Sequence, residues 1–559
     1  MPWPKTKKEA DSLWKKRIKL ALLNLQLAGQ TLEEAKEKLI KRYSNQLNRI
    51  EQENGADVFE SVVNALTLLY GPHTNYWSPR TSENFNINMS LSLEGIGAVL
   101  QSEDEFTKVV RLVPAGPAYK QGQLKPADRI VGVGQGNDEI IDIVGWRLDE
   151  VVQKIRGPKK TTVRLEVLPA DAPVGGTTKI VNIVRDKVKL EDQAAQKAIL
   201  EVSDGDKLYK LGVIDLPAFY MDFDAYHRRD PNFKSSTRDV DRLLRELMAE
   251  NVDGVILDLR NNGGGSLNEA SFLTDLFIDQ GPVVQIRTPD RPVNRQFRSM
   301  SRALYRGPLV VLVNRLSASA SEIFAGAIQD YSRGLVVGSQ SFGKGTVQSV
   351  TDVKEGQLKI TESKFYRVSG DSTQHRGVIP DIELPVLIDK DDVGESAYDN
   401  ALIWDQIRSA PHAKYFDFSM LVPELTELHE RRVQTDPDLL YILDQKKVIE
   451  KNKSKKTISL NKKTRIKEKD DLETEAMSLE NKRLKAKGLE VYKDLAAYRK
   501  AEEKEEEEEE EAAANEPLNK IDIEGDTLLI ETGNILADFI RLFDNRPASN
   551  VADQKTARK

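Results

Sequence analysis

An alternation of short apolar runs and helical segments between Leu208 and Leu387 limits the fold more than any other feature of the chain. The runs are short and often β-branched, as buried strands are, and amphipathic segments separate several of them. The strand candidates are Leu211–Leu216, Gly254–Leu259, Val283–Ile286, Leu309–Val313 and Leu335–Val337, and the helix candidates are Thr237–Glu250, Leu267–Phe277 and Ser319–Asp330. This alternation predicts an α/β unit with a largely parallel sheet.

The segments on either side of this unit have different textures, and a chain of 559 residues is too long for one hydrophobic core. Apolar residues recur at helical spacing over residues 8–70. From about Ser90 to Ala170, short apolar runs surround a single amphipathic helix at Leu148–Ile155, which predicts a small β-sandwich or barrel. After about Asp389 the chain becomes polar and helical.

Charge is unevenly distributed along the chain. The formal net charge is −7, and the run from Glu502 to Glu511 contains nine Glu and one Lys. The rest is nearly neutral, so no overall field favours nucleic acid as a partner. We interpret this acidic run and the basic segment Lys446–Lys469 as solvated helix or disorder rather than as specific binding sites.

Several classes of site are excluded or disfavoured by composition. Cysteine is absent, which excludes disulfides, thiolate nucleophiles and Cys-ligated metals. The chain has no apolar stretch of about 20 residues, so we expect no transmembrane segment, and its start lacks the apolar region of a signal peptide. The histidines lack the spacing of a metal site, and we interpret each as a surface or packing residue: His73, His227, His375, His412 and His429.

The segment Asn314–Phe324, with sequence NRLSASASEIF, joins a predicted strand to a predicted helix. A serine at a helix N-terminus has an exposed hydroxyl beside free N–H groups that can stabilise an oxyanion. Ser317, Ser319 and Ser321 compete for this role. A simple N-cap is the alternative, because Ser319 and Glu322 match a capping box, and the segment alone favours that alternative.

A serine nucleophile needs a base, and the nearest candidate is Lys344 in a Gly-Lys-Gly sequence after a predicted strand. Burial can lower the pKa of such a lysine until the amine is neutral, and Gln348 could hydrogen-bond that amine. The segment Gly338–Lys344 also matches the first seven positions of a phosphate-binding loop. That alternative fits poorly, since the eighth position is Gly345 instead of Ser or Thr and the following residues resemble a strand.

Two glycine-rich loops could present backbone amides to a ligand. The sequence DLRNNGGGS over Asp258–Ser266 follows a predicted strand and could supply a second donor for an oxyanion hole. The sequence LEGIG over Leu93–Gly97 begins the β-rich module and could hold a carboxylate, with the next strand adding an extended peptide. A flexible loop and a hairpin loop, respectively, are the simpler interpretations.

Together these segments resemble the C-terminal-processing (tail-specific) proteases of peptidase family S41, and most closely their long periplasmic branch. The resemblance covers about Asp57 to Ile407 well and rests on Gly71–Pro79, Ser92–Val99, Gly132–Gly134, Asp258–Gly265, Ser317–Glu322, Phe342–Gln348, Gly377–Asp381 and Asp399–Asp405. It implies a multidomain α+β protein: a crotonase/ClpP-like α/β protease core with an inserted PDZ domain and helical regions at both ends.

The resemblance also implies a role for each site residue. Ser319 is the nucleophile, and Lys344, 25 positions later, is the general base with Gln348 as its helper. The amides of Gly265 and Ala320 form the oxyanion hole, and Asp330 has a supporting role. In the PDZ domain, the backbone of Gly95, Ile96 and Gly97 binds the substrate carboxylate, while Leu148 and Val152 line the pocket for an apolar last side chain.

From this resemblance we expect an N-terminal helical region over residues 1–87, a PDZ domain over 88–185, a serine protease core over 186–390 and a C-terminal helical region over 391–559. The implied protein is a periplasmic serine endopeptidase that acts on proteins with exposed apolar C-termini and works with a lipid-anchored helical-repeat adaptor. It requires neither metal nor nucleotide. A non-catalytic peptide-binding scaffold is the rival from another functional class.

Overall fold

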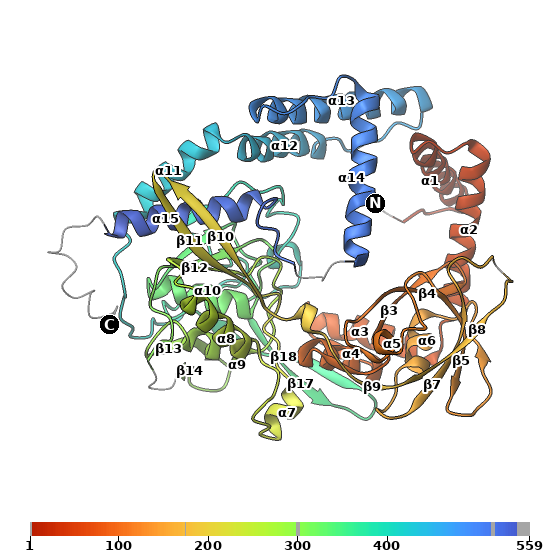
Figure 1. Ribbon diagram of the computed structural model, residues 1–559, viewed down its shortest axis with the longest axis horizontal. Coiled ribbons are helices and arrows are strands. Elements are labelled where there is room, and N and C mark those ends of the chain that lie inside the picture. Colours follow the sequence, from red (N-terminus) through yellow and green to blue (C-terminus); the bar gives the residue numbers. More distant parts are fainter. Residues whose placement is uncertain (1–2, 174, 298–301, 516–519, 545–559) are drawn as a thin grey trace.

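The computed structural model describes residues 3–173, 175–297, 302–515 and 520–544. Figure 1 shows an α/β core domain beside a smaller β-rich domain, with N-terminal helices next to the latter and C-terminal helices bridging across the top. The N-terminal helices are α1 (Lys7–Leu27), α2 (Leu32–Glu51), α3 (Gly55–Thr67) and α4 (Pro79–Ser90), with the 3₁₀ turn η1 at Leu68–Tyr70.

The core domain is built on a six-stranded sheet in the order β10-β11-β12-β15-β16-β19. All neighbouring strands except the β10–β11 hairpin are parallel, which confirms the predicted largely parallel sheet. The bounds are β10 Gln196–Asp204, β11 Lys207–Asp215, β12 Gly254–Asp258, β15 Leu309–Val313, β16 Leu335–Gly338 and β19 Ile382–Glu383.

Helices cover both faces of this sheet, which explains why its strands are continuous apolar runs. In β12, Val255 and Leu257 belong to one hydrophobic cluster, and Ile256 between them belongs to another on the opposite face. The first face packs against α8 (Ser236–Ala249), α9 (Leu267–Asp275) and α10 (Ala320–Asp330), and the second against α11 (Leu421–Thr435) and α15 (Thr527–Asp544).

Helix α15 therefore completes the core, although it lies in the region expected to form a separate C-terminal unit. Its side chains Leu536 and Ile540 are buried among the residues of the second cluster. The sequence predicted only a helical region after about Asp389 and could not show that one of its helices returns to the sheet. The short helix α7 (Phe223–His227) and the turns η2 (Glu191–Gln193) and η3 (Glu395–Ala397) complete the elements of this part of the chain.

A second, antiparallel sheet lies beside the first. Its long strand β18 pairs with β17 along one edge and with β1 and β13 along the other. The prediction that Val283–Ile286 belongs to the parallel sheet is wrong, because β13 pairs antiparallel with β18; an apolar run indicates a buried strand without specifying its sheet. The bounds are β1 Asn75–Trp77, β13 Pro282–Arg287, β14 Asn294–Phe297, β17 Thr346–Asp352 and β18 Gln357–Tyr366.

The β-rich domain is built on a sheet in which five strands lie in the order β3-β4-β5-β7-β8 and β6 pairs with β5. Its chain enters through β2 (Ser92–Gly95) and leaves through β9 (Asp186–Lys189), and these two strands pair with each other as expected of an inserted domain. The remaining elements are β3 Ala98–Glu103, β4 Phe106–Leu112, α5 Pro117–Gln121, β5 Arg129–Gln135, β6 Ile141–Asp142, α6 Leu148–Ile155, β7 Thr162–Leu168 and β8 Lys179–Val184.

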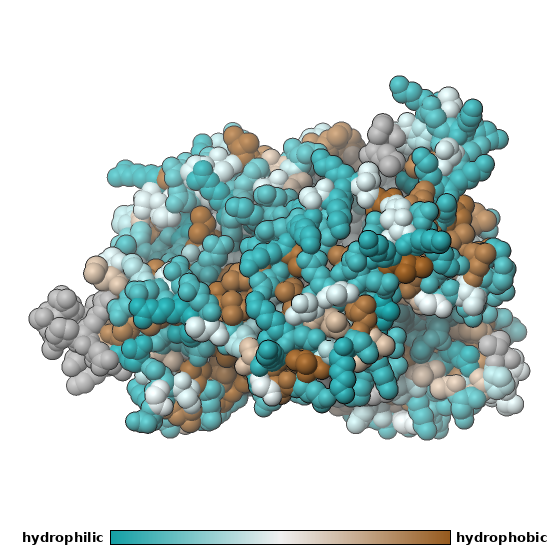
Figure 2. Space-filling model, turned by 90° about the horizontal axis from the view of Figure 1, so that it is seen from above, coloured by the Kyte–Doolittle hydropathy of each residue, from teal (hydrophilic) through white to brown (hydrophobic). Residues whose placement is uncertain are grey.

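The C-terminal helices α12 (Pro437–Lys453), α13 (Lys462–Ala486) and α14 (Leu495–Asn515) form the bridge at the top of Figure 1. Helix α13 has no buried residue, and the described side chains of the acidic run in α14, Glu502–Glu508, are exposed. Figure 2 shows that the face of the molecule seen from above is mostly hydrophilic. These helices are solvated, as the charge runs indicated.

Candidate active site

The turn between β15 and α10 places Ser319 directly before the first residue of the helix. Its backbone has φ 57° and ψ −110°, a conformation that residues with a side chain seldom adopt and that costs about 1–3 kcal/mol. The Ser319 amide donates to Oε2 of Glu322 at 2.7 Å, and the two residues form the predicted capping box. The Ser319 hydroxyl therefore stands at the start of α10, beside the free N–H groups of its first turn.

The carboxylate of Glu322 joins the turn that contains Ser319 to the loop that contains Lys344. Its Oε2 accepts hydrogen bonds from the amides of Ser319 and Lys344, at 2.7 and 2.9 Å. Its Oε1 accepts from the Ser341 hydroxyl at 2.6 Å and from the Gly343 amide at 2.7 Å. Burial raises the pKa of Glu322 to about 7, although the four hydrogen bonds act to lower it. One oxygen atom thus fixes the two backbones relative to each other.

Lys344 lies in the loop between β16 and β17, where it is largely removed from solvent. Among the described residues its amine has neither a carboxylate partner nor a hydrogen bond. Burial, and secondly the nearby charge of Lys359, lower the pKa of Lys344 to about 8. The loop amides are occupied by the Glu322 carboxylate and β17 is a strand, so the phosphate-binding alternative has neither free amides nor the helix it needs.

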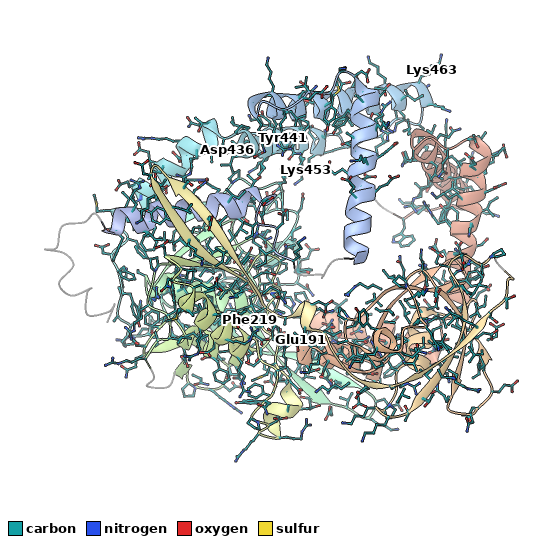
Figure 3. All side chains as sticks on the ribbon, viewed as in Figure 1. Glu191, Phe219, Asp436, Tyr441, Lys453 and Lys463 are labelled. Atoms are coloured by element: carbon teal, nitrogen blue, oxygen red, sulfur yellow. The ribbon has the colours of Figure 1, made fainter. Side chains whose placement is uncertain are left out.

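The glycine loop after β12 packs against the same turn. The Ala318 amide donates to the Asn262 carbonyl at 2.9 Å, and a Cβ atom on Gly264 would lie 2.8 Å from Cβ of Ser319. Gly265 has φ 143°, and a Cβ there would lie 2.3 Å from the carbonyl oxygen of Phe219, which is labelled in Figure 3. Only glycine permits this close approach.

The two amides expected to bind an oxyanion are available. The Phe219 N–H donates to the Gly264 carbonyl, and the Phe219 carbonyl accepts the Ser266 amide. The N–H of Gly265 takes no part in this pairing. Ala320 is the first residue of α10, so its N–H has no acceptor within the helix. No hydrogen bond from either amide occurs within the part of the chain that the structure describes.

Two predicted helpers have other partners. The Gln348 amide donates to the hydroxyls of Thr346 and Thr361, at 2.8 and 3.2 Å, and not to Lys344. Asp330, at the far end of α10, pairs with Arg367 at 2.5 Å and accepts the Ser369 amide at 3.0 Å. Gln348 is thus near the loop without contacting the amine, and Asp330 holds the end of the helix. Their functional roles stay predictions.

The predicted peptide site of the β-rich domain lies at the edge of its sheet. Strand β3 has a partner on one side only, and it follows directly after Gly95, Ile96 and Gly97. Helix α6 packs against β3, and its residues Leu148 and Val152 are only half-buried. An edge strand beside an incompletely covered apolar helix face can accept an extended peptide.

A buried network of hydrogen bonds supports the Lys344 loop, and the sequence did not predict it. The fully buried Glu395 accepts hydrogen bonds from Gln374 at 2.8 Å and pairs with Nε2 of His73 at 2.8 Å. Gln374 in turn accepts the Gly345 amide at 2.8 Å. His73 is thus a polar packing residue, and its position in the family motif gave no sign of its partner. No group of three His, Asp or Glu side chains within the described ranges is arranged to hold a metal ion.

Comparison with known proteins places this architecture in a family. Residues 1–80 match the tail specific protease N-terminal domain, 84–168 a PDZ domain, 210–384 peptidase family S41 and 388–541 the C-terminal domain of tail specific protease. The chain is 41% identical over 504 residues to the tail-specific protease of Haemophilus influenzae, covering 88% of this chain and 70% of that protein. This chain belongs to the tail-specific proteases of family S41.

Other relatives have related names. The carboxy-terminal-processing protease of Bartonella bacilliformis is 31% identical, over 58% of this protease and 69% of its own length. Among solved structures, the photosystem II D1 C-terminal processing protease is 24% identical, with 68% of this protease and 96% of that chain covered and a TM-score of 0.34. The match to peptidase family S41 and to a PDZ domain, with the 41% identity to a tail-specific protease, makes this chain a serine-type peptidase with a PDZ domain. Over the described residues, none of its helices has the length and apolarity to cross a bilayer.

Proposed function

We propose that this protease is an endopeptidase of the cell envelope in which Ser319 and Lys344 form a catalytic dyad. The observation that carries the proposal is the shared Oε2 of Glu322, which accepts the backbone amides of both residues. Because the Lys344 amine is buried and has no acid partner among the described residues, it can exist in its neutral form near pH 8.

In this mechanism the neutral Lys344 amine takes the proton of the Ser319 hydroxyl as the serine oxygen attacks a peptide carbonyl. The N–H groups of Gly265 and Ala320 stabilise the oxyanion, each contributing about 3 kcal/mol to the transition state. The protonated amine then donates its proton to the leaving amine, and water hydrolyses the acyl-enzyme. The pKa of about 8 is well matched to both steps.

We further propose that the PDZ domain binds the apolar C-terminus of the protein substrate at Gly95–Gly97, Leu148 and Val152. A separate groove of about 750 Å³, which none of these residues lines, connects the start of the PDZ domain with the core. Leu93 and Glu94 line it on the PDZ side, and Met221 lines it on the core side. Met221 accepts a contact from the Ser266 hydroxyl at 3.6 Å, so the groove ends beside the glycine loop. The lipid-anchored adaptor stays a prediction.

Cleavage of an unfolded protein with a small apolar C-terminus tests the function. We expect Ser319→Ala and Lys344→Ala to abolish cleavage, while EDTA leaves the wild type unaffected. Equal cleavage by the wild type and both variants would contradict the dyad and favour the peptide-binding scaffold. A substrate whose C-terminus ends in two aspartates is the control for recognition: we expect a higher KM with little change in kcat.

A further inference from the structure

The two serines on either side of Ser319 are buried and hydrogen-bonded, which removes them as nucleophiles. Ser317 and Ser321 are both fully buried. The Ser317 hydroxyl donates to the Leu259 carbonyl at 2.7 Å, and the Ser321 hydroxyl donates to the Asn262 carbonyl at 2.9 Å. A hydroxyl has a single proton to donate. Both serines use it to bind the glycine loop that follows β12, from positions two residues before and two residues after the nucleophile.

These hydrogen bonds join two loops that leave the parallel sheet side by side. Strands β12 and β15 are neighbours and run parallel, so the glycine loop and the turn before α10 begin at the same edge of the sheet. The Ala318 amide adds a third hydrogen bond, to the Asn262 carbonyl at 2.9 Å. Three donors of the turn that contains Ser319 therefore bind two carbonyl oxygens of the loop that contains Gly265.

Asn262 connects these contacts to the amide of Gly265. Its fully buried side chain accepts the Gly264 amide at 2.9 Å through Oδ1 and donates to the Leu216 carbonyl at 2.7 Å through Nδ2. The carbonyl of Gly264 accepts the Phe219 N–H at 2.9 Å. Because a trans peptide is planar, this bond also fixes the direction of the Gly265 N–H, which points the opposite way. The position of Asn262 thus determines where that N–H lies.

We propose that Ser317 and Ser321 are positioning residues, which keep the oxyanion donor of the glycine loop aligned with the nucleophile. The inference rests on the proposed function, in which Ser319 attacks and Gly265 stabilises the oxyanion. A donor acts on the transition state only when it points at the place where the charge develops. The other donor, Ala320, follows Ser319 directly in the chain. Gly265 belongs to a different loop, so its alignment depends on the bonds between the loops.

Removal of the two hydroxyls from the full chain tests this role. Ser317→Ala, Ser321→Ala and the double variant are compared with Thr532→Val, which removes a fully buried hydroxyl that donates to the Leu528 carbonyl of α15 at 2.7 Å. With a short peptide that the wild type cleaves at one bond, we expect kcat to fall about tenfold in each single variant and about a hundredfold in the double variant, because complete loss of one oxyanion donor costs about 10²–10³ in kcat. KM should stay within about twofold of the wild type, and Thr532→Val should keep the wild-type kcat.

A second peptide, with sulfur in place of the scissile carbonyl oxygen, separates a misaligned donor from a general loss of structure. Sulfur accepts hydrogen bonds poorly, so it gains little from the oxyanion hole and the wild type should prefer the oxygen peptide. We expect the ratio of the two kcat/KM values to fall about tenfold in Ser317→Ala and in Ser321→Ala, and to stay unchanged in Thr532→Val. The fraction of folded protein cancels in this ratio, because one preparation cleaves both peptides.

The outcomes separate the positioning role from the proposed function. A kcat and an oxygen preference that stay at their wild-type values in both serine variants would overturn the positioning role. An equal loss of rate for the two peptides would overturn it as well, because such a loss leaves the oxyanion hole intact. Cleavage by Ser319→Ala at the rate of the wild type would instead overturn the proposed function.

Discussion

Substitution of Glu322 provides the most direct test of how the site is assembled. The fully buried carboxylate accepts four hydrogen bonds, from the amides of Ser319, Gly343 and Lys344 and from the hydroxyl of Ser341. Each buried donor that loses its acceptor costs about 1–3 kcal/mol. The isosteric Glu322→Gln retains one oxygen and can satisfy the donors that share one carboxylate oxygen in the wild type, whereas Glu322→Ala satisfies none.

The best orientation for the glutamine can be worked out from these donors. With its oxygen in the place of Oε2 it still accepts the amides of Ser319 and Lys344, and the Ser341 hydroxyl can turn to accept its NH₂ group. The Gly343 amide then faces a donor. We therefore expect Glu322→Gln to lower the free energy of unfolding by about 1–3 kcal/mol, and Glu322→Ala to lower it by several times that amount.

Urea unfolding measures the loss of stability, and kcat for a saturating peptide at a temperature where both variants are folded measures the geometry of the dyad. A shared anchor predicts that kcat falls at least tenfold in Glu322→Ala and less in Glu322→Gln. The reverse order of the two variants, or a loss of stability without a loss of kcat, would refute the idea that this carboxylate holds nucleophile and base together.

Three further predictions concern the sheet, its acidic edge and the peptide site. Leu536→Ala should destabilise the core by about 2–5 kcal/mol in urea, because this side chain of α15 is fully buried against the parallel sheet; a second, separate unfolding transition would contradict that placement. Burial, and secondly the charge of Asp258, raise the pKa of Asp215 to about 7. Between about pH 4 and pH 7 the folded state keeps a proton on Asp215 that the unfolded state has lost, so the folded state loses stability as the pH rises through this range. Asp215→Asn should therefore have a free energy of unfolding about 2–4 kcal/mol higher than the wild type above pH 7, and an equal one below pH 4. Leu148→Asp should raise KM for substrates with apolar C-termini and leave kcat for short peptides unchanged; an equal effect on both substrates would exclude a recognition role.

The sequence predicted the parallel sheet and the turn before α10 because both depend on local signals. Strands buried on two faces must be apolar throughout, and β15 and β16 are nearly continuous Val and Leu. A serine followed by a helix-forming segment likewise shows where a hydroxyl meets free amides. Such signals do not depend on which distant segment packs nearby, so the pattern alone was sufficient.

The features that escaped prediction depend on contacts between distant segments. The pairing of His73 with Glu395 joins residues 322 positions apart, and neither type is rare enough to identify its partner. Lys359 has an unremarkable sequence position, and its contact with the ring of Trp77 depends on a strand much earlier in the chain. The return of α15 to the sheet is equally invisible, since an amphipathic helix can cover any apolar surface.

These distant contacts converge on the small loop that holds Lys344. The segment before the PDZ domain contributes His73, the C-terminal region contributes Glu395, and the core contributes the loop itself. Burial is the main reason why the pKa of Lys344 is lowered, and hydrogen bonds from outside the core support its loop. The proposed role of Lys344 as the base therefore depends on contacts of its loop with residues from the N-terminal segment and from the C-terminal region. Residues 210–384 contain Ser319 and Lys344, but two residues of the network that supports the Lys344 loop, His73 and Glu395, come from outside that range.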